Sequence, residues 1–509
     1  MRVVAAATGT AAPSPSATAA SARAPPAAHD RGRMAASGRR RSAMSPTISP
    51  ARPRPRGPPP RSLPPVRVAV TSRVRALGFG GAVKALVAFE LAVIAVSAIA
   101  IVARFPVFAL VDERAHYSYV QVVSEQQRLP VLARDRTSAV VQAVGEGVYP
   151  RRSRQEPAHQ SGLAAFSYEA FQPPAYYLTA APLFALLPDY RDKVRVLRAF
   201  DALLLACALL LLWRLAREIA GPRALALFAF ALTAMMWPGV VVRSVTISNA
   251  ALEMVAAPAV ILLLWRAHAR GDGRLLVAGG AALGAALLTR LTLAALAPVL
   301  IVVAALAVRS RGRRALPASA AALALPVLML VPWLAFNLDH FHALTAERVV
   351  RRMQEPLLNP TRRLYGLGDL AHGLRILLRG VLPEEWWVEY LSTPKRLLSE
   401  VFGALFLLGP LVFGWVAPAA DRRRLFGFLV APGLVVVAGL VYALVAANWA
   451  AFLLPRYLYP ELGGFCLFAA LIWRRLLGER GLVWLSALLA GALAAVWIHL
   501  ATVHPFAGP

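Results

Sequence analysis

An acidic pair beside a histidine stands near the start of a chain that is otherwise strongly hydrophobic. The sequence reads Asp112-Glu113-Arg114-Ala115-His116-Tyr117 directly after the first long apolar stretch. Ionisable residues at a membrane boundary are costly to keep, which makes this cluster a candidate for acid–base chemistry such as proton removal from a hydroxyl group. The alternative is that Asp112 and Glu113 cap a juxtamembrane helix, because acidic side chains favour helix N-termini.

Three further motifs carry residues suited to binding. They are Phe171-Gln172-Pro-Pro-Ala-Tyr176-Tyr177, Arg243-Ser-Val-Thr-Ile-Ser-Asn249 and Pro455-Arg456-Tyr457-Leu-Tyr-Pro460, and each adjoins an apolar segment. Arginine binds phosphate through paired hydrogen bonds, so Arg456 is the first candidate for a phosphate contact, with Arg290 as a weaker one. Arg456 and Tyr457 could instead be interfacial anchors, and Ser248 or Asn249 could cap a helix.

Carboxylates and aromatic residues alternate in Glu384-Glu-Trp-Trp-Val-Glu-Tyr390, which could contact a sugar but is more typical of a helix lying in the membrane interface. No zinc-ligand spacing, glycine-rich phosphate loop or serine nucleophile elbow is visible. The sequence therefore predicts no metal site of its own, although a divalent cation could assist. Cys207 and Cys466 lie in separate apolar segments and predict no disulfide.

The hydrophobicity of the chain identifies an integral membrane protein. Of its 509 residues, 58% are hydrophobic, mean hydropathy is +0.58, and apolar runs recur at about the 20 residues that cross a bilayer as a helix. The net charge of +29 could suggest nucleic acid. Much of this charge instead falls in short loops between apolar segments, which is the positive-inside pattern, so no nucleic-acid partner is predicted.

The basic loops also predict the topology. Every second loop after the first span carries an arginine cluster, and placing all of these loops in the cytoplasm gives about eleven spans. This parity requires the short apolar stretch Pro174–Leu187 to be re-entrant or interfacial, and a crossing there would make the total twelve. Two long loops, 105–196 with juxtamembrane helices and 337–398, then face outward from a multi-pass plasma-membrane domain at 81–509.

Residues 1–80 form a basic segment rich in alanine and proline. They show no apolar periodicity, so we expect a disordered cytoplasmic tail that could touch anionic lipid. A dispensable extension is an equally good interpretation. The fold class predicted is therefore an all-α polytopic membrane protein with about 11–12 transmembrane helices behind this tail.

The first external loop resembles that of a known superfamily. A span followed by Asp-Glu-x-x-His-Tyr, a Leu-Pro at Leu129-Pro130 and the Gln172-Pro-Pro element is similar to the GT-C glycosyltransferases that use polyprenyl-phosphate sugars. Family 39 and the lipid A aminoarabinose transferases are the nearest branches. The resemblance covers roughly 82–475, and its motifs are concentrated in 108–180.

The resemblance implies an enzyme with a lipid-linked sugar donor, a glycan, lipid or protein acceptor outside the membrane, and family roles for particular residues. Asp112 matches the catalytic carboxylate, and Glu113 could replace it. The implied binding residues are His116, Tyr117, Gln172, Tyr176, Arg243, Arg456 and Tyr457. The family often has an acidic residue directly after the asparagine, where this chain has Ala250, and Glu253 could compensate.

Two other functional classes fit parts of the sequence. A transporter or flippase of lipid-linked saccharides would suit intramembrane ionisable residues such as Lys84, Glu90 and Asp201. Such transporters often contain internal repeats, and neither the Asp112 nor the Gln172-Pro-Pro174 element recurs, which favours the enzyme. The departure at Ala250 also leaves a non-catalytic membrane scaffold as an interpretation.

Overall fold

The structure, a computed structural model, describes residues 66–108, 112–132, 134–138, 141, 168–345, 425–447 and 455–503. Its regular elements in these ranges are all helical. Five helical stretches are long and apolar enough to cross a membrane: Gly78–Arg104, Tyr190–Met235, Ala250–Arg270, Leu291–Phe341 and Tyr459–Thr502. The prediction of an all-α polytopic membrane protein is confirmed.

Three of these stretches contain two helices joined by a tight turn at a glycine. α6 (Tyr190–Ala220) meets α7 (Ala224–Met235) at Gly221–Arg223, and α11 (Ala297–Arg311) meets α12 (Leu316–Phe341) at Gly312–Ala315. α20 (Tyr459–Val503) bends at Gly478. All three glycines have positive φ, a conformation that favours residues without a Cβ. Each of these three stretches therefore contributes two helices to the structure. One of the predicted spans, the apolar run at 399–418, lies outside the described residues.

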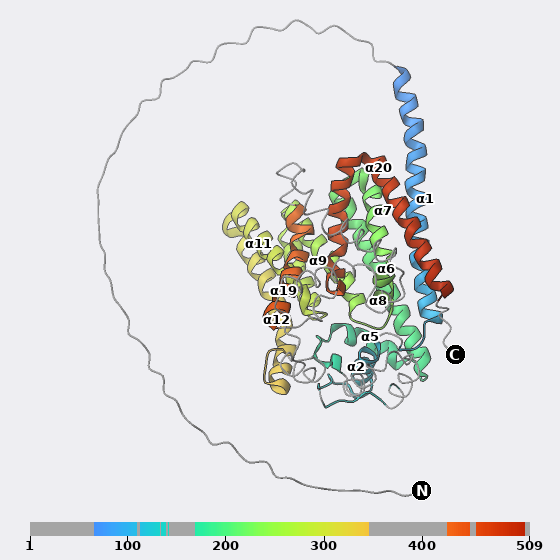
Figure 1. The fold of residues 1–509 in the computed structure, drawn as a ribbon. Helices are drawn as coiled ribbons and strands as arrows, with labels where there is room; N and C mark the ends of the chain where they lie inside the picture. Colours follow the sequence, from blue (N-terminus) through green and yellow to red (C-terminus); the bar gives the residue numbers. More distant parts are fainter. Residues whose placement is uncertain are drawn as a thin grey trace, which may run out of the picture. The chain divides into compact units, whose positions relative to one another are not determined.

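The arginine-rich turns gather at one end of the helices. Glu218 of α6 forms an ion pair with Arg266 of α9 (Ala250–Arg270), and Arg311 lies against the backbone of Gly271. Figure 1 shows the α20 bend at the same end and the helices α2 (Glu113–Gln126) and α5 (Ala175–Ala185) at the other. This separation is the arrangement that the positive-inside argument requires, and we expect the basic end to face the cytoplasm.

Cysteine labelling tests this orientation. In a chain with Cys207→Ala and Cys466→Ala, a cysteine at the exposed Gln126 should react with an impermeant maleimide added outside intact cells. A cysteine at the exposed Arg313, in the α11–α12 turn, should react only after the membrane is opened. The opposite labelling pattern would mean that the acidic cluster faces the cytoplasm.

α1 (Val66–Arg104) contains the first predicted span. Its membrane-crossing part runs from Gly78 to Arg104, close to residue 81, where the sequence predicts that the membrane domain begins. The tail residues 1–65 lie outside the described part of the chain. On the membrane-crossing part, large apolar side chains such as Val96 and Ile99 are exposed, which is expected of a surface that contacts lipid.

Small residues allow α10 (Gly273–Leu287) to pack closely on α12. A Cβ atom at Gly280 would overlap the carbonyl oxygen of Ala322, and one at Gly284 would lie 2.6 Å from the sulfur of Met329. Close approach of helix backbones through small residues is a usual way to hold membrane helices together. This packing fixes the position of the turn after α10, where Arg290 lies.

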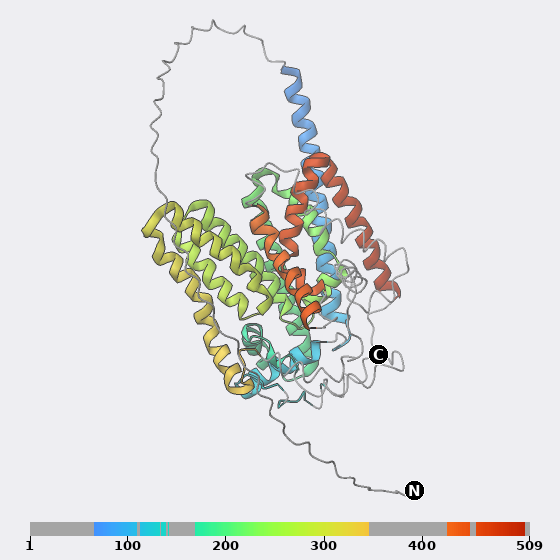
Figure 2. The ribbon, with the colours of Figure 1, turned by 60° about the vertical axis from the view of Figure 1, so that its left-hand side comes forward.

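α2 and α5 pack on each other at the end of the bundle opposite the basic turns (Figure 2). α5 has 11 residues, so its length is about 16 Å, well short of an apolar core of about 30 Å. The apolar stretch at 174–187 thus forms a short helix, as its length predicts. Tyr117 and Tyr119 of α2 and Tyr177 and Phe184 of α5 join the helices in an apolar cluster that also contains Leu197 of α6.

Candidate active site

Asp112 lies at the N-terminus of α2 but does not cap it through its side chain. Its carboxylate accepts a hydrogen bond from Arg243 of α8 (Pro238–Val245) at 3.0 Å between Oδ2 and Nη2. Both side chains are buried, with 7% and 5% exposed. A buried carboxylate that pairs with an arginine and does not cap its helix favours the interpretation of Asp112 as a reactive group over the capping interpretation.

Glu113, the neighbour of Asp112, has a different partner. Arg198 of α6 donates two hydrogen bonds to it, from Nε to Oε1 at 2.8 Å and from Nη2 to Oε2 at 2.7 Å. Arg198 also donates to the carbonyl oxygens of Phe105 and Pro106, just after the end of α1. Glu113 therefore joins the first loop to the bundle, and this bidentate pairing favours a structural role over the alternative catalytic one.

His116 faces the second tyrosine of the Gln-Pro-Pro motif. Its Nδ1 atom and the Tyr177 hydroxyl are hydrogen-bonded at 2.8 Å, and Tyr119 stacks on Tyr177 with ring centroids 3.5 Å apart. Burial raises the pKa of Tyr177 well above its ordinary value, with Glu169 and Tyr119 acting in the same direction, while Arg290 and Arg243 oppose the shift. Tyr177 is thus neutral at physiological pH, and both arginines lie within electrostatic reach of it.

The Gln-Pro-Pro motif connects four elements. The Gln172 carbonyl accepts a hydrogen bond from Tyr119 of α2, and its side-chain oxygen accepts one from Asn249 at 3.4 Å. Asn249 also donates to the carbonyl of Thr289 after α10, instead of capping α9 through its side chain. The backbone N–H of Ala175 donates to the Leu288 carbonyl. These bonds position the start of α5 against the turns before α9 and after α10.

Tyr176 points away from His116 and toward the bundle. Its hydroxyl donates to Asp201 of α6 at 3.0 Å, and the same carboxylate oxygen accepts from the backbone N–H of Ser248. Both Tyr176 and Asp201 are fully buried, so these hydrogen bonds lie in the interior of the protein. The ionisable Asp201, one feature that suited a transporter, here anchors α5 to α6 and to the turn before α9.

Arg290 lies at the centre of a second cluster of charged and polar side chains. Its Nη1 atom donates to Glu253 of α9 at 2.7 Å, and Thr292 donates to the other oxygen of Glu253, also at 2.7 Å. The guanidinium lies 4.8 Å from the ring centroid of Tyr457 in η8 (Pro455–Leu458). Glu461, in the first turn of α20, lies within electrostatic reach of Glu253 and Arg290. Glu253, three residues after Ala250, where the sequence departs from the family pattern, therefore forms an ion pair with Arg290.

The structure brings most of the predicted residues together, but not all. Asp112, His116, Gln172 and Arg243 belong to one connected group. Tyr117 is instead directed into the apolar cluster, between Phe108 and Phe184 in edge-to-face contacts, which does not suit the predicted donor-binding role. The side chain of Arg456 and the segment 384–390 lie outside the described residues.

Sequence reasoning did not place four residues in the predicted site: Arg198, Glu169, Glu461 and Asp201, the last of which was considered only for the transporter alternative. Arg198 and Asp201 lie three residues apart on one face of a predicted span, which is a recognisable signal for an intramembrane site. Glu169 precedes the Gln-Pro-Pro motif and lies within electrostatic reach of Tyr177. Glu461 follows Pro460 at the start of a span, where an acidic residue reads as an ordinary helix-terminal charge.

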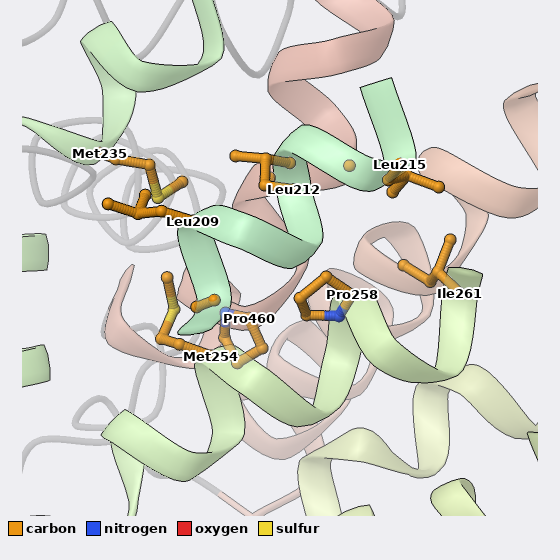
Figure 3. Close-up of a pocket in the computed structure, with 11 residues that line it drawn as sticks. Leu209, Leu212, Leu215, Met235, Met254, Pro258, Ile261 and Pro460 are labelled. Atoms are coloured by element: carbon orange, nitrogen blue, oxygen red, sulfur yellow. The ribbon is translucent and has the colours of Figure 1, made fainter. Parts of the chain in front are cut away.

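Within the described ranges, no group of three histidine, cysteine or carboxylate side chains is arranged to hold a metal ion. Cys207 and Cys466 are both free thiols. An apolar pocket with about 350 Å³ of empty volume lies between α6, α9 and α20 (Figure 3), and its lining, which includes Met254 and Pro460, contains no ionisable side chain. The side chains that could carry out acid–base chemistry or bind a phosphate therefore lie in the polar cluster and not in this pocket.

Residues 172–336 match the family model of the dolichyl-phosphate-mannose-protein mannosyltransferases. This match confirms the resemblance to the GT-C glycosyltransferases. It implies glycosyltransferase activity of GT-C type and covers the part of the site that contains Gln172, Tyr177, Arg243 and Arg290. Asp112 and Glu461 lie outside the matched residues. Asp112 contacts the matched region through Arg243, and Glu461 lies within electrostatic reach of Glu253 and Arg290 in that region. No curated protein matches the chain.

Proposed function

We propose that this protein transfers a sugar from a polyprenyl-phosphate donor to an acceptor on the outer side of the plasma membrane. The observation that carries the proposal is the buried contact between Asp112 and Arg243. It joins a carboxylate from the first loop to an arginine inside the region that matches the mannosyltransferase family. A base and an anion-binding group are thereby held side by side.

Asp112 is the proposed general base. The hydroxyl oxygen of the acceptor attacks C1 of the sugar, and its proton passes to the Asp112 carboxylate. The bond between C1 and the phosphate oxygen breaks, and the polyprenyl phosphate leaves with the electron pair. Attack from the face opposite the phosphate inverts the configuration at C1. The contact with Arg243 holds the Asp112 carboxylate in a fixed orientation, which this role requires.

Arg243 and Arg290 are the proposed binding groups for the donor phosphate. Among the described residues, the Nε atom of Arg243 has no hydrogen-bond partner, so this guanidinium can bind an anion while it contacts Asp112. Arginine side chains aimed at a departing phosphate stabilise the charge that develops as the bond to the sugar breaks. Arg456 remains a third candidate, on the evidence of its sequence motif alone.

His116 and Tyr177 are proposed to position the donor between these arginines. Their mutual hydrogen bond and the stacking of Tyr119 hold both rings in place. Because Tyr177 keeps its proton, its hydroxyl can donate to a phosphate or sugar oxygen. Glu113, in contrast, is proposed to act only through the position of α2.

An assay with a defined donor tests the proposed function. The purified full-length protein, in lipid vesicles with solubilised cell-envelope material as acceptor, should release polyprenyl phosphate from polyprenyl-phosphate mannose and transfer the labelled sugar. Mannose is the first sugar to test because it appears in the description of the matching family. Movement of the donor across the vesicle membrane without any transfer would favour the transporter alternative.

Substitution of Arg243 tests the phosphate-binding role. Arg243→Gln should lower kcat/KM for the donor roughly 10- to 100-fold, the effect of losing hydrogen bonds to a charged group. Arg266→Gln is the matched control, because it removes an arginine–glutamate pair at the opposite end of the helices. An equal loss in both variants would show that the effect is not specific to the site.

A further inference from the structure

Glu461 has a buried carboxyl group that no other described residue hydrogen-bonds. Its side chain belongs to a residue that is only 1% exposed, in the first turn of α20. Within the described part of the chain, neither carboxyl oxygen accepts a hydrogen bond from another residue. A buried polar group of this kind destabilises the fold, so its presence calls for an explanation in terms of function.

The described residues around Glu461 do not hydrogen-bond its carboxyl group. Arg290 is within electrostatic reach but gives its hydrogen bond to Glu253, whose other oxygen accepts from Thr292. The apolar pocket next to Pro460 offers no alternative, because its lining consists of alanine, leucine, isoleucine, methionine, proline and glycine. Among the described residues, Arg290 and Glu253 thus form their hydrogen bonds with each other and with Thr292, and the carboxyl group of Glu461 is left to bind a ligand.

The charges of this cluster select the chemistry of a ligand. On the side of Arg290 where Glu253 and Glu461 lie, the two carboxyl groups disfavour an anion, and the described residues supply no third acidic side chain for a metal ion. A neutral group with hydroxyl donors fits, since a carboxyl can accept several hydrogen bonds at once. Tyr457, which precedes Glu461 by one turn, contributes an aromatic ring to the same cluster through its contact with Arg290.

We infer that Glu461 accepts hydrogen bonds from hydroxyl groups of the transferred sugar and so determines which sugar the site uses. This inference rests on the proposed function. Arg290 would then lie between the two parts of the donor, with the phosphate on one side of its guanidinium group and the sugar toward Glu461. A site built to bind a hydroxyl discriminates strongly against an analogue that lacks it, because the buried carboxyl is left without a partner.

Donor analogues test this role. With wild-type protein, polyprenyl-phosphate mannose should be preferred over analogues that lack one hydroxyl group at C2, C3, C4 or C6. Glu461→Gln should lower kcat/KM for the mannose donor roughly 10- to 100-fold and should reduce the discrimination against at least one deoxy analogue. Glu479→Gln, directly after the Gly478 bend of α20, is the matched control and should behave as wild type.

Thermal unfolding separates this role from a structural one. Because no other described residue hydrogen-bonds the Glu461 carboxyl group, Glu461→Gln should unfold at the wild-type temperature or above it. A lower unfolding temperature, or failure to fold, would assign Glu461 to the fold and overturn the inference. An active wild type with unchanged discrimination in Glu461→Gln would overturn it while leaving the proposed function intact. Absence of transfer by the wild type would overturn both.

Discussion

Replacing Asp112 by asparagine should abolish sugar transfer while the protein remains folded in the membrane. Asparagine has nearly the same shape and can still contact Arg243, but it cannot take the proton of the acceptor hydroxyl. Loss of a general base lowers the rate by on the order of 10²- to 10⁴-fold. The measurement is the initial rate of sugar transfer from polyprenyl-phosphate mannose at saturating donor, normalised to the amount of protein in the vesicles.

Asp192→Asn is the matched control for this substitution. Asp192 pairs with Arg195 on the exposed first turn of α6, with more than half of each side chain exposed, so its loss should leave the rate unchanged. Donor binding should also separate the two roles, since Asp112→Asn should bind the donor nearly as well as wild type. Full transfer activity in Asp112→Asn would show that another group removes the proton.

The second large effect concerns stability. Glu113→Gln should lower the free energy of unfolding by about 3–5 kcal/mol, because it leaves the buried Arg198 without its opposite charge. Arg198→Met should cost at least as much, since it also removes the donors to the carbonyls of Phe105 and Pro106. Unfolding of the detergent-purified protein in increasing denaturant, followed by circular dichroism, measures both.

The double variant Glu113→Met with Arg198→Met separates the two contributions. Removing both charges avoids an isolated buried ion and should recover part of the stability. Recovery should stay incomplete, because the carbonyl groups at the end of α1 would still lack the arginine. Transfer activity that survives in a folded double variant would support the structural assignment of Glu113. Complete loss of transfer in that variant would instead return Glu113 to the catalytic candidates.

The sequence predicted those features that depend on local composition. Apolar runs of membrane-crossing length identified the helices, and the 14-residue apolar segment at 174–187 was too short to cross a bilayer of ordinary thickness. The arginine clusters indicated which turns share one end of the bundle. Asp112 and the Gln172-Pro-Pro motif could be recognised because polar residues next to a membrane span raise the free energy of the protein and therefore indicate a function.

Pairings between distant segments could not be predicted in this way. Asp112 and Glu113 are adjacent in sequence, yet neighbouring residues at the start of a helix point about 100° apart, so one contacts Arg243 and the other Arg198. Which carboxylate has which arginine depends on how α2 sits against α6 and α8. Glu461 was missed for a related reason, because only the packed structure shows that a helix-terminal acid lacks a partner.

The glycine packing of α10 on α12 has a consequence for movement during a reaction cycle. Where helix backbones touch, as at Gly280 and Ala322, neither helix can slide or tilt without a collision. α2 and α5 are held differently, through side chains that can change partners, such as Arg243 and Tyr176. We therefore expect α10 and α12 to stay fixed relative to each other, while admission and release of the proposed lipid-linked donor depend on small displacements of α2 and α5.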